Sequence, residues 1–333
     1  MRMRVTVLGA GSWGTTVAAL MARRNEGLIW ARRPGVSDEI NTEHTHKRYL
    51  AGFALPTQLR ATPDLEVAAR HSEVLVVAVP SDAFRDVLVA ARPHLHPWIP
   101  VVSLTKGLER GTLMRMTEVI KDVLPGHPAA ALTGPNLAKE IMAGLAAATV
   151  VATEDLSVAA ALQDVFRRGL FRVYTNHDVV GCEIGGAMKN VVAIATGIAQ
   201  GLSVGDNTRA AVMARGLAEL TQLGVAMGAE AATFAGLAGL GDLVATCISP
   251  QSRNRYLGEQ LGLGRSVADI LAEMGQVAEG VKTVHSAVEL ADRFGLGMPI
   301  TRAIHRVVTG QTGAPVAYAG LMGAPAGHEA EPG

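Results

Sequence analysis

The chain has 333 residues, and at roughly 150 residues per domain its length predicts two domains. Apolar residues make up 49% and charged residues 18%, which supports buried cores and excludes a disordered chain. Thirty basic and thirty acidic residues cancel, so charge does not indicate nucleic acid or an anionic membrane as a partner. The chain has no run of about 18 uninterrupted apolar residues, which argues against membrane insertion, and we expect a cytoplasmic protein.

In the first half of the chain, short β-branched runs alternate with helical patterns such as residues 15–24 and 82–91. This alternation is typical of a parallel sheet with crossover helices. Most candidate strands are almost wholly apolar, as strands covered on both faces are. They are residues 4–8, 28–31, 74–79, 101–104, 129–133, 148–152 and 171–174.

After about residue 176 the strand patterns stop, and long Ala/Leu/Met stretches follow at helical spacing. The expected helices are residues 182–200, 209–227, 267–275, 283–294 and 300–308. We therefore expect an α/β domain over residues 1–178, an all-α domain over 179–322, and a disordered tail over 323–333, which is rich in Gly, Pro, Ala and Glu.

A glycine-rich turn joins the first predicted strand to the first predicted helix. Its three glycines, at positions 9, 11 and 14, have the GxGxxG spacing of a dinucleotide-binding turn. Gly9 permits the tight turn, Gly11 lets a pyrophosphate approach the backbone, and Gly14 lets the helix pack against the strand. Free N–H groups at the helix start bind phosphate. The first domain is therefore expected to be a Rossmann-like, doubly wound parallel sheet.

The second predicted strand ends in Arg32 and Arg33 rather than in the acidic residue that binds the ribose 2′-hydroxyl of NAD. Two guanidinium groups suit a 2′-phosphate, so the pattern favours NADPH over NADH. Two alternatives stay open: solvated loop arginines, and an adenine stacked on a guanidinium plane with either cofactor.

Other predicted strands end in short polar or glycine-bearing turns at the sheet edge where ligands bind. Lys106 lies in one such turn, and the chain has only six lysines against twenty-four arginines. Its ammonium is placed to contact substrate or nicotinamide ribose, although a solvent-facing loop lysine explains this position equally well.

The predicted helical domain holds candidates for the chemistry. Gly181, Gly185 and Lys189 are spaced four apart and so share one helix face, where a buried lysine could donate a proton. A helix-surface lysine is the alternative. Asp242 supplies one carboxylate among glycines.

A second part of the helical domain resembles a phosphate site. Ser252 is the expected N-cap of a helix whose start, with Arg253 and Asn254, would bind an anion. A simple N-cap beside exposed arginines is the alternative. The segment that holds Val277 and Glu279 precedes another helix, either as a capping turn or as a loop that closes on the cofactor.

Taken in order, the motifs GAGSWG, TKG, GPNLAKE, GGAMKN, GLGDL and SRNR extend over nearly the whole chain. Because it has these motifs in this order, the chain resembles the bacterial NAD(P)-dependent glycerol-3-phosphate dehydrogenases. The resemblance implies reversible reduction of dihydroxyacetone phosphate to sn-glycerol 3-phosphate, which supplies glycerophospholipid synthesis.

The resemblance also implies roles for individual residues. Lys189 would be the catalytic proton donor, and Asp242 would hold the substrate hydroxyl and orient Lys189. The remaining substrate contacts would be Lys106, Gly134, Asn136, Ser252, Arg253 and Asn254. The cofactor contacts would be Gly9, Gly11, Ser12, Trp13, Gly14, Arg32, Arg33, Tyr49, Lys106, Ala138, Arg253, Val277 and Glu279. No metal is implied.

One position departs from the family pattern, which usually shows Tyr-Leu-Pro-Gly where this chain has Tyr49, Leu50, Ala51 and Gly52. This departure puts the rigidity of the Tyr49 loop in question.

Two alternative functions remain: a related β-hydroxyacid or sugar-acid dehydrogenase, and a non-enzymatic NADPH sensor. The glycine-rich helix faces fit either packing within the domain or a homodimer.

Overall fold

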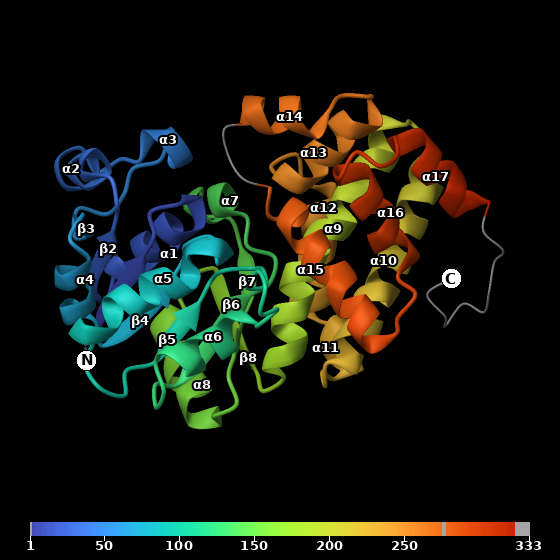
Figure 1. The fold of residues 1–333 in the computed structure, drawn as a ribbon. Coiled ribbons are helices and arrows are strands. Elements are labelled where there is room, and N and C mark those ends of the chain that lie inside the picture. The colour runs from blue at the N-terminus through green and yellow to red at the C-terminus, as the bar shows by residue number, and fades with distance from the viewer. Residues whose placement is uncertain (1, 275–277, 324–333) are drawn as a thin grey trace. The chain divides into compact units, whose positions relative to one another are not determined.

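The computed structural model describes residues 2–274 and 278–323. The chain divides into two compact units (Figure 1). The first ends at Val179 and the second begins at Val180. The expected tail from residue 324 onward, and the candidate cofactor residue Val277, lie outside the described residues.

The first unit is built on one eight-stranded sheet with the strand order β3-β2-β1-β4-β5-β6-β7-β8. This arrangement confirms the predicted doubly wound α/β fold, with the order reversing between β1 and β4, where such sheets bind ligands. The strands are β1 (Arg4–Leu8), β2 (Glu26–Trp30), β3 (Arg60–Thr62), β4 (Val74–Val77), β5 (Val101–Ser103), β6 (Ala129–Thr133), β7 (Ala147–Ala152) and β8 (Phe171–Asn176).

Alternate residues of each central strand enter different cores on the two faces of the sheet. In β2, Ile29 belongs to one cluster while Leu28 and Trp30 belong to the other, and β4 divides in the same way. Successive side chains of a strand point to opposite faces, so an almost wholly apolar strand needs helices on both sides.

Helices cover both of these cores. One core includes residues of α1 (Ser12–Ala22), α2 (Pro34–Thr42), α7 (Ala138–Met142) and α8 (Leu156–Phe166). The other includes residues of α4 (Leu65–His71), α5 (Ser81–Ala91) and α6 (Met116–Val123). The short helix α3 (Lys47–Leu50) precedes β3.

Two features of the sheet differ from the prediction. The three-residue strand β3 was not predicted, because so short a segment shows no periodicity. Strand β7 pairs antiparallel with β6, although a wholly parallel sheet was predicted. Helix α7, which joins them, has five residues and spans only about 7.5 Å, so it is too short to return the chain to the opposite end of the sheet.

The described part of the second unit is helical. Its elements are α9 (Val179–Gly201), α10 (Asp206–Ala226), α11 (Ala231–Phe234), a π-helical turn (Leu237–Gly241), α12 (Asp242–Ile248), α13 (Arg253–Gly262), α14 (Val267–Met274), α15 (Glu279–Phe294), α16 (Pro299–Val308) and α17 (Ala314–Met322).

Two helical segments have the length and hydropathy of a membrane span, Val179–Gly201 and Ala231–Ile248. The apolar window of the first is 94% buried and that of the second is 44% buried. A buried core helix passes the same test of composition, and α9 is the core helix of the second unit.

Glycines bring helices α9 and α13 into close backbone contact. A Cβ at Gly258 would overlap the Ile194 carbonyl, and one at Gly262 would lie 2.6 Å from the Ile198 carbonyl oxygen. Gly197 makes the reciprocal approach to the backbone of α13. This contact brings the start of α13 beside the part of α9 that follows Lys189.

Candidate functional site

The glycine-rich turn of the first unit has the geometry that a dinucleotide requires. Gly9 has φ +114°, and a Cβ there would lie 2.7 Å from the Ala78 carbonyl oxygen. Gly14 packs so closely that a Cβ would overlap the Gly9 carbonyl. No atom lies within 4 Å of a Cβ built at Gly11, so the backbone there is open to a pyrophosphate.

Helix α1 begins at Ser12 with its first N–H groups available to an anion. Its N-cap is Gly11, no side chain caps it, and its first turn holds no acidic residue. Uncapped N–H groups and the helix dipole together favour a phosphate at this position. The His46 Nε2 atom lies 2.9 Å from the Ala10 carbonyl oxygen and ties the turn to α3.

The other predicted contacts near this turn are also placed by the structure. Arg32 and Arg33 follow β2 and are exposed, and within the described residues neither guanidinium has an ion-pair partner. Trp13 packs edge-on against Phe171, with ring centroids 6.3 Å apart. Ala138 is the first residue of α7.

The Tyr49 loop keeps its shape without proline. Ala51 has φ −52° and ψ 131°, Gly52 has φ +86°, and the Phe53 N–H donates to the Leu50 carbonyl at 3.1 Å. These angles define a type II turn, in which proline favours the position that Ala51 occupies. The Tyr49 ring packs edge-on against His46, with centroids 5.2 Å apart.

Lys106 is not a free surface lysine. Its Nζ donates to the Gly134 carbonyl at 2.9 Å, which joins the turn after β5 to the turn after β6. Nearby, the Thr149 hydroxyl donates to the Thr133 carbonyl and therefore accepts from Asn136 Nδ2, at 2.9 Å. The Asn136 Oδ1 atom is left buried without a hydrogen-bond partner in the described chain, so it is an acceptor that is available to a ligand.

In the second unit, Lys189 and Asp242 form a buried ion pair. Lys189 lies on α9 and Asp242 begins α12; they are 7% and 1% exposed, and Lys189 Nζ donates to Asp242 Oδ1. Lys189 Nζ also donates to Thr246 Oγ1 at 2.8 Å, and the Thr246 hydroxyl donates to the Asp242 carbonyl at 2.6 Å. The amine is therefore held in one orientation by two oxygens from the same helical turn.

A π-helical turn places Asp242 at this position. The Gly241 N–H donates to the Gly236 carbonyl at 3.0 Å, the i to i−5 bond of a π-helix. Gly185 lets this turn approach α9, because a Cβ there would lie 2.7 Å from the Ala238 carbonyl oxygen. The predicted glycine face of α9 therefore receives the backbone of this turn at Gly185.

The predicted phosphate site is the start of α13. Ser252 is its N-cap, as predicted, and its hydroxyl accepts from the Arg255 N–H at 3.2 Å. Arg253 is the first helical residue and is exposed. The remaining first-turn N–H groups point along the helix axis, as in anion-binding helix termini.

The Asn254 side chain is engaged within the unit. Its Oδ1 accepts from the Gly280 N–H at 3.0 Å, and its Nδ2 donates to Asn190 Oδ1 at 2.9 Å. Because the Gly280 N–H can only donate, it fixes the orientation of both amides. The start of α15, where Glu279 lies, is therefore linked to the residue after Lys189.

Cys247 is buried beside the Lys189–Asp242 ion pair. It is 2% exposed, and burial raises the pKa of its thiol to about 11, although a hydrogen bond with Thr196 and the charge of Lys189 oppose the rise.

Two residues beside Lys189 were not predicted as site residues, Thr246 and Asn190. Thr246 follows Asp242 by four positions and so shares its helix face, which is the signal that would have found it. Asn190 follows Lys189 directly, and only its contact with Asn254 distinguishes it.

These two halves define a class of protein. A dinucleotide-binding sheet, together with a helical unit that buries a lysine–carboxylate pair, is typical of dehydrogenases that use a nicotinamide cofactor.

Models of known protein families identify the family of this chain. The N-terminal family model of the NAD-dependent glycerol-3-phosphate dehydrogenases matches residues 4–159, and the C-terminal model matches residues 178–317. The chain therefore belongs to the NAD-dependent glycerol-3-phosphate dehydrogenase family, and it is an oxidoreductase that interconverts dihydroxyacetone phosphate and sn-glycerol 3-phosphate.

Individual relatives agree over the whole length. The chain is 54% identical over 333 residues to glycerol-3-phosphate dehydrogenase (NAD(P)+) 2 of Sphingopyxis alaskensis, covering 100% of both chains. It is 52% identical to the corresponding enzyme 1 of Mycobacterium bovis, covering 98% of this chain and 96% of that one. The crystal structure of the Coxiella burnetii enzyme has a TM-score of 0.93 at 35% identity, covering 97% of this chain and 99% of that chain.

Proposed function

We propose that this enzyme reduces dihydroxyacetone phosphate with NADPH as its preferred cofactor, and that Lys189 gives the proton to the ketone oxygen. The observation that supports this role most is the buried contact of Lys189 with Asp242 and Thr246. A nicotinamide in its reduced form, when bound, supplies the hydride that goes to C2 of the substrate.

The proton step uses the lysine ammonium. As C2 is reduced, its oxygen gains negative charge, and an ammonium beside it both stabilises that charge and transfers a proton. Asp242 and Thr246 keep the amine in one orientation, and Asp242 also accepts from the substrate hydroxyl. In the reverse direction the neutral amine takes the proton from the C2 hydroxyl.

The substrate phosphate binds at the start of α13. Ser252, Arg253 and the first backbone N–H groups of the helix supply donors for a dianion. The Asn254 side chain bonds to Gly280 and Asn190, and so it orients these two neighbours. What Asn254 contributes to phosphate binding is its backbone N–H at the helix start. Phosphate binding energy is thereby available to place the ketone.

The first unit binds the cofactor at the turn that holds Gly9, Gly11, Ser12 and Gly14, with Trp13 and Tyr49 beside it and Ala138 on α7. Arg32 and Arg33 bind the 2′-phosphate of NADPH, and their exposure without ion-pair partners in the described chain supports this assignment. Lys106 contacts substrate and cofactor, Gly134 and Asn136 contact substrate, and Glu279 completes the cofactor site.

The setting of the enzyme is part of the same proposal. A cytoplasmic location, a homodimeric state and a supply of sn-glycerol 3-phosphate to glycerophospholipid synthesis fit this reaction. The proposed reaction requires neither a nucleic-acid partner nor stable insertion of the enzyme into a membrane.

The experiment that tests the substrate site compares Arg253→Ala with Arg265→Ala, a control at a partly exposed arginine that pairs with Glu273. Oxidation of NADPH is followed with dihydroxyacetone phosphate and with dihydroxyacetone. We expect Arg253→Ala to raise KM for the phosphorylated substrate by about 10- to 100-fold, the loss of one charge-assisted contact, and to leave the unphosphorylated one unchanged. Equal losses for both substrates would contradict a phosphate site at Arg253.

A further inference from the structure

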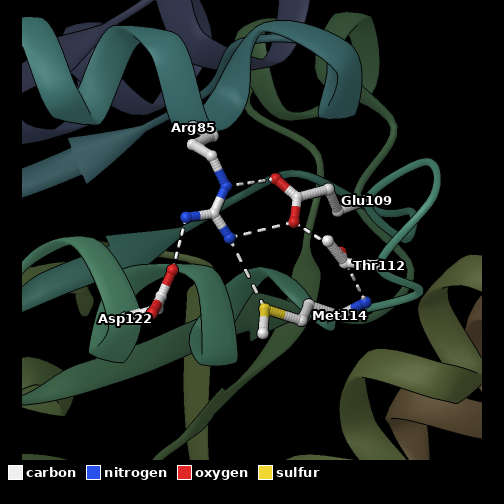
Figure 2. Close-up of polar contacts among 5 residues, drawn as sticks. All are labelled: Arg85, Glu109, Thr112, Met114 and Asp122. Carbon is white, nitrogen blue, oxygen red and sulfur yellow. Dashed lines mark hydrogen bonds and ion pairs between the residues drawn. The ribbon is translucent and has the colours of Figure 1, made fainter.

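A charged cluster in the first unit joins three segments that are distant in sequence (Figure 2). Arg85 on α5 binds Glu109 in two places, with Nε 2.7 Å from Oε1 and Nη2 3.0 Å from Oε2. Its Nη1 binds Asp122 on α6. Glu109 lies three residues after Lys106, so this two-point contact anchors the segment that follows β5.

The segment after Lys106 is a closed hairpin under backbone strain. The Glu109 N–H donates to the Met114 carbonyl at 2.9 Å, and the Leu113 N–H donates to the Glu109 carbonyl at 3.0 Å. Leu113 has φ +63°, a left-handed conformation that residues other than glycine rarely adopt. Such strain persists only where the surrounding contacts determine the backbone, and Glu109 makes most of those contacts.

Lys106 therefore lies between two anchors. On one side, the Thr105 hydroxyl donates to the Val79 carbonyl at 2.6 Å, which ties the backbone to the end of β4. On the other side, Arg85 holds Glu109. With both sides anchored, the Lys106 side chain reaches the Gly134 carbonyl at 2.9 Å.

We propose that Arg85, acting through Glu109, is a positioning residue for Lys106. The inference rests on the proposed function, in which Lys106 contacts substrate and cofactor. Arg85 itself touches neither. It keeps the hairpin, and with it the lysine ammonium, where the reaction needs a cation.

The pKa shifts of Arg85 and Glu109 favour the charged form of both side chains. The hydrogen bonds from Arg85 lower the pKa of Glu109, and those from Glu109 and Asp122 raise the pKa of Arg85. A guanidinium fork on a carboxylate is both stronger and more directional than a neutral pair.

The two arms of Arg85 differ in exposure, which provides a matched control. The Glu109 side chain is 12% exposed and the Asp122 side chain is 52% exposed. Exposed ion pairs contribute little to stability. Asp122→Asn thus removes one arm of Arg85 and leaves the fork on Glu109 intact.

The test is a double-mutant cycle in the full chain with Glu109→Gln, Lys106→Met and both together, and with Asp122→Asn as control. Each variant is measured for thermal unfolding, NADPH binding and kcat/KM for dihydroxyacetone phosphate. We expect Glu109→Gln to lower kcat/KM by about tenfold, since small misplacements of a binding group are costly. In the Lys106→Met background, Glu109→Gln should change kcat/KM by less than about twofold, while its effect on the temperature of thermal unfolding persists.

Three results would overturn the proposal. Equal losses from Glu109→Gln in both backgrounds would show that Glu109 does not act through Lys106. A loss from Asp122→Asn as large as that from Glu109→Gln would show that the two-point contact of Arg85 with Glu109 has no special role. An unaltered kcat/KM in Glu109→Gln alone would show that the anchor is not needed. Arg85→Lys, which keeps the charge and removes the fork, repeats the test if Glu109→Gln does not fold.

A failure of the proposed function gives a different result. Unimpaired kcat/KM and NADPH binding in Lys106→Met alone would contradict the role of Lys106, and the positioning role would fail with it. If only the positioning role fails, Lys106→Met stays impaired.

Discussion

Lys189 of α9 donates a hydrogen bond to Asp242 of α12, 53 residues further along the chain, with both side chains buried. The pair depends on a π-helical turn directly before Asp242 and on Gly185, which lets that turn approach α9. Backbone irregularity of this kind is frequent at functional sites, and here it aims a carboxylate at an amine.

Removal of the Asp242 charge should therefore affect both stability and turnover. Asp242→Asn leaves the Lys189 ammonium buried without a counter-charge, and breaking a buried ion pair destabilises a protein by about 3–5 kcal/mol. We expect a lower denaturation midpoint in urea and a kcat reduced by at least about tenfold, because the amine loses its orientation. Thr246→Ser, which keeps the hydroxyl, is the control. If Asp242→Asn and Thr246→Ser behaved alike, the carboxylate would have no special role.

The two arginines after β2 should determine cofactor preference. Arg32→Ala/Arg33→Ala removes both cations that we propose bind the 2′-phosphate, and each charge-assisted contact contributes about 1.5–3 kcal/mol. We expect kcat/KM with NADPH to fall by at least about tenfold, with a much smaller change for NADH. The ratio of kcat/KM values for the two cofactors is the measurement. An unchanged ratio would favour the alternatives of solvated arginines or adenine stacking.

The turn at Ala51 is shaped for proline. Its φ of −52° lies in the range that a proline ring imposes, and Gly52 already adopts the positive φ of the next position. Ala51→Pro should raise the free energy of unfolding by about 0.4–1 kcal/mol, because it restricts the unfolded chain. Thermal unfolding of Ala51→Pro beside Ala51→Ser measures this gain. A lower unfolding temperature in Ala51→Pro would show that proline does not fit the turn.

Cys247 should resist thiol reagents in the folded enzyme. Burial raises the pKa of its thiol to about 11, so at pH 8 only about one thiol in a thousand is ionised, against about a quarter for an ordinary cysteine. We expect a disulfide reagent to leave native activity unchanged at pH 8, with labelling that increases as the pH approaches 11. Cys182 is buried as well, and both thiols should react after unfolding in urea. Rapid loss of activity at pH 8, prevented by Cys247→Ala, would contradict the raised pKa.

Local patterns predicted much of this molecule. The glycine turn, the buried strands and the Ser252 cap each depend on a few adjacent residues, so spacing was enough to find them. The resemblance to the family then selected Lys189 over the surface-lysine alternative, and the structure places that lysine in a buried pair.

Contacts between distant segments could not be read from spacing. Three contacts join elements that are far apart in the sequence, so no local periodicity indicates them. They are the contact of Arg85 with Glu109, the bond of Asn254 to Asn190, and the glycine contact of α9 with α13. The antiparallel strand β7 was missed for a related reason, since direction depends on the reach of α7 rather than on the strand itself.

The central role assigned to Lys189 is tested most directly by single-turnover oxidation of NADPH by Lys189→Ala with saturating dihydroxyacetone phosphate. Lys121→Ala, at an exposed lysine that pairs with Glu154, is the control. We expect a rate reduced by about 10²- to 10⁴-fold, with NADPH affinity unchanged and partial recovery on addition of ethylammonium. A rate in Lys189→Ala within about threefold of the Lys121→Ala rate would be far higher than a missing general acid allows. It would contradict the assignment of Lys189 as the proton donor.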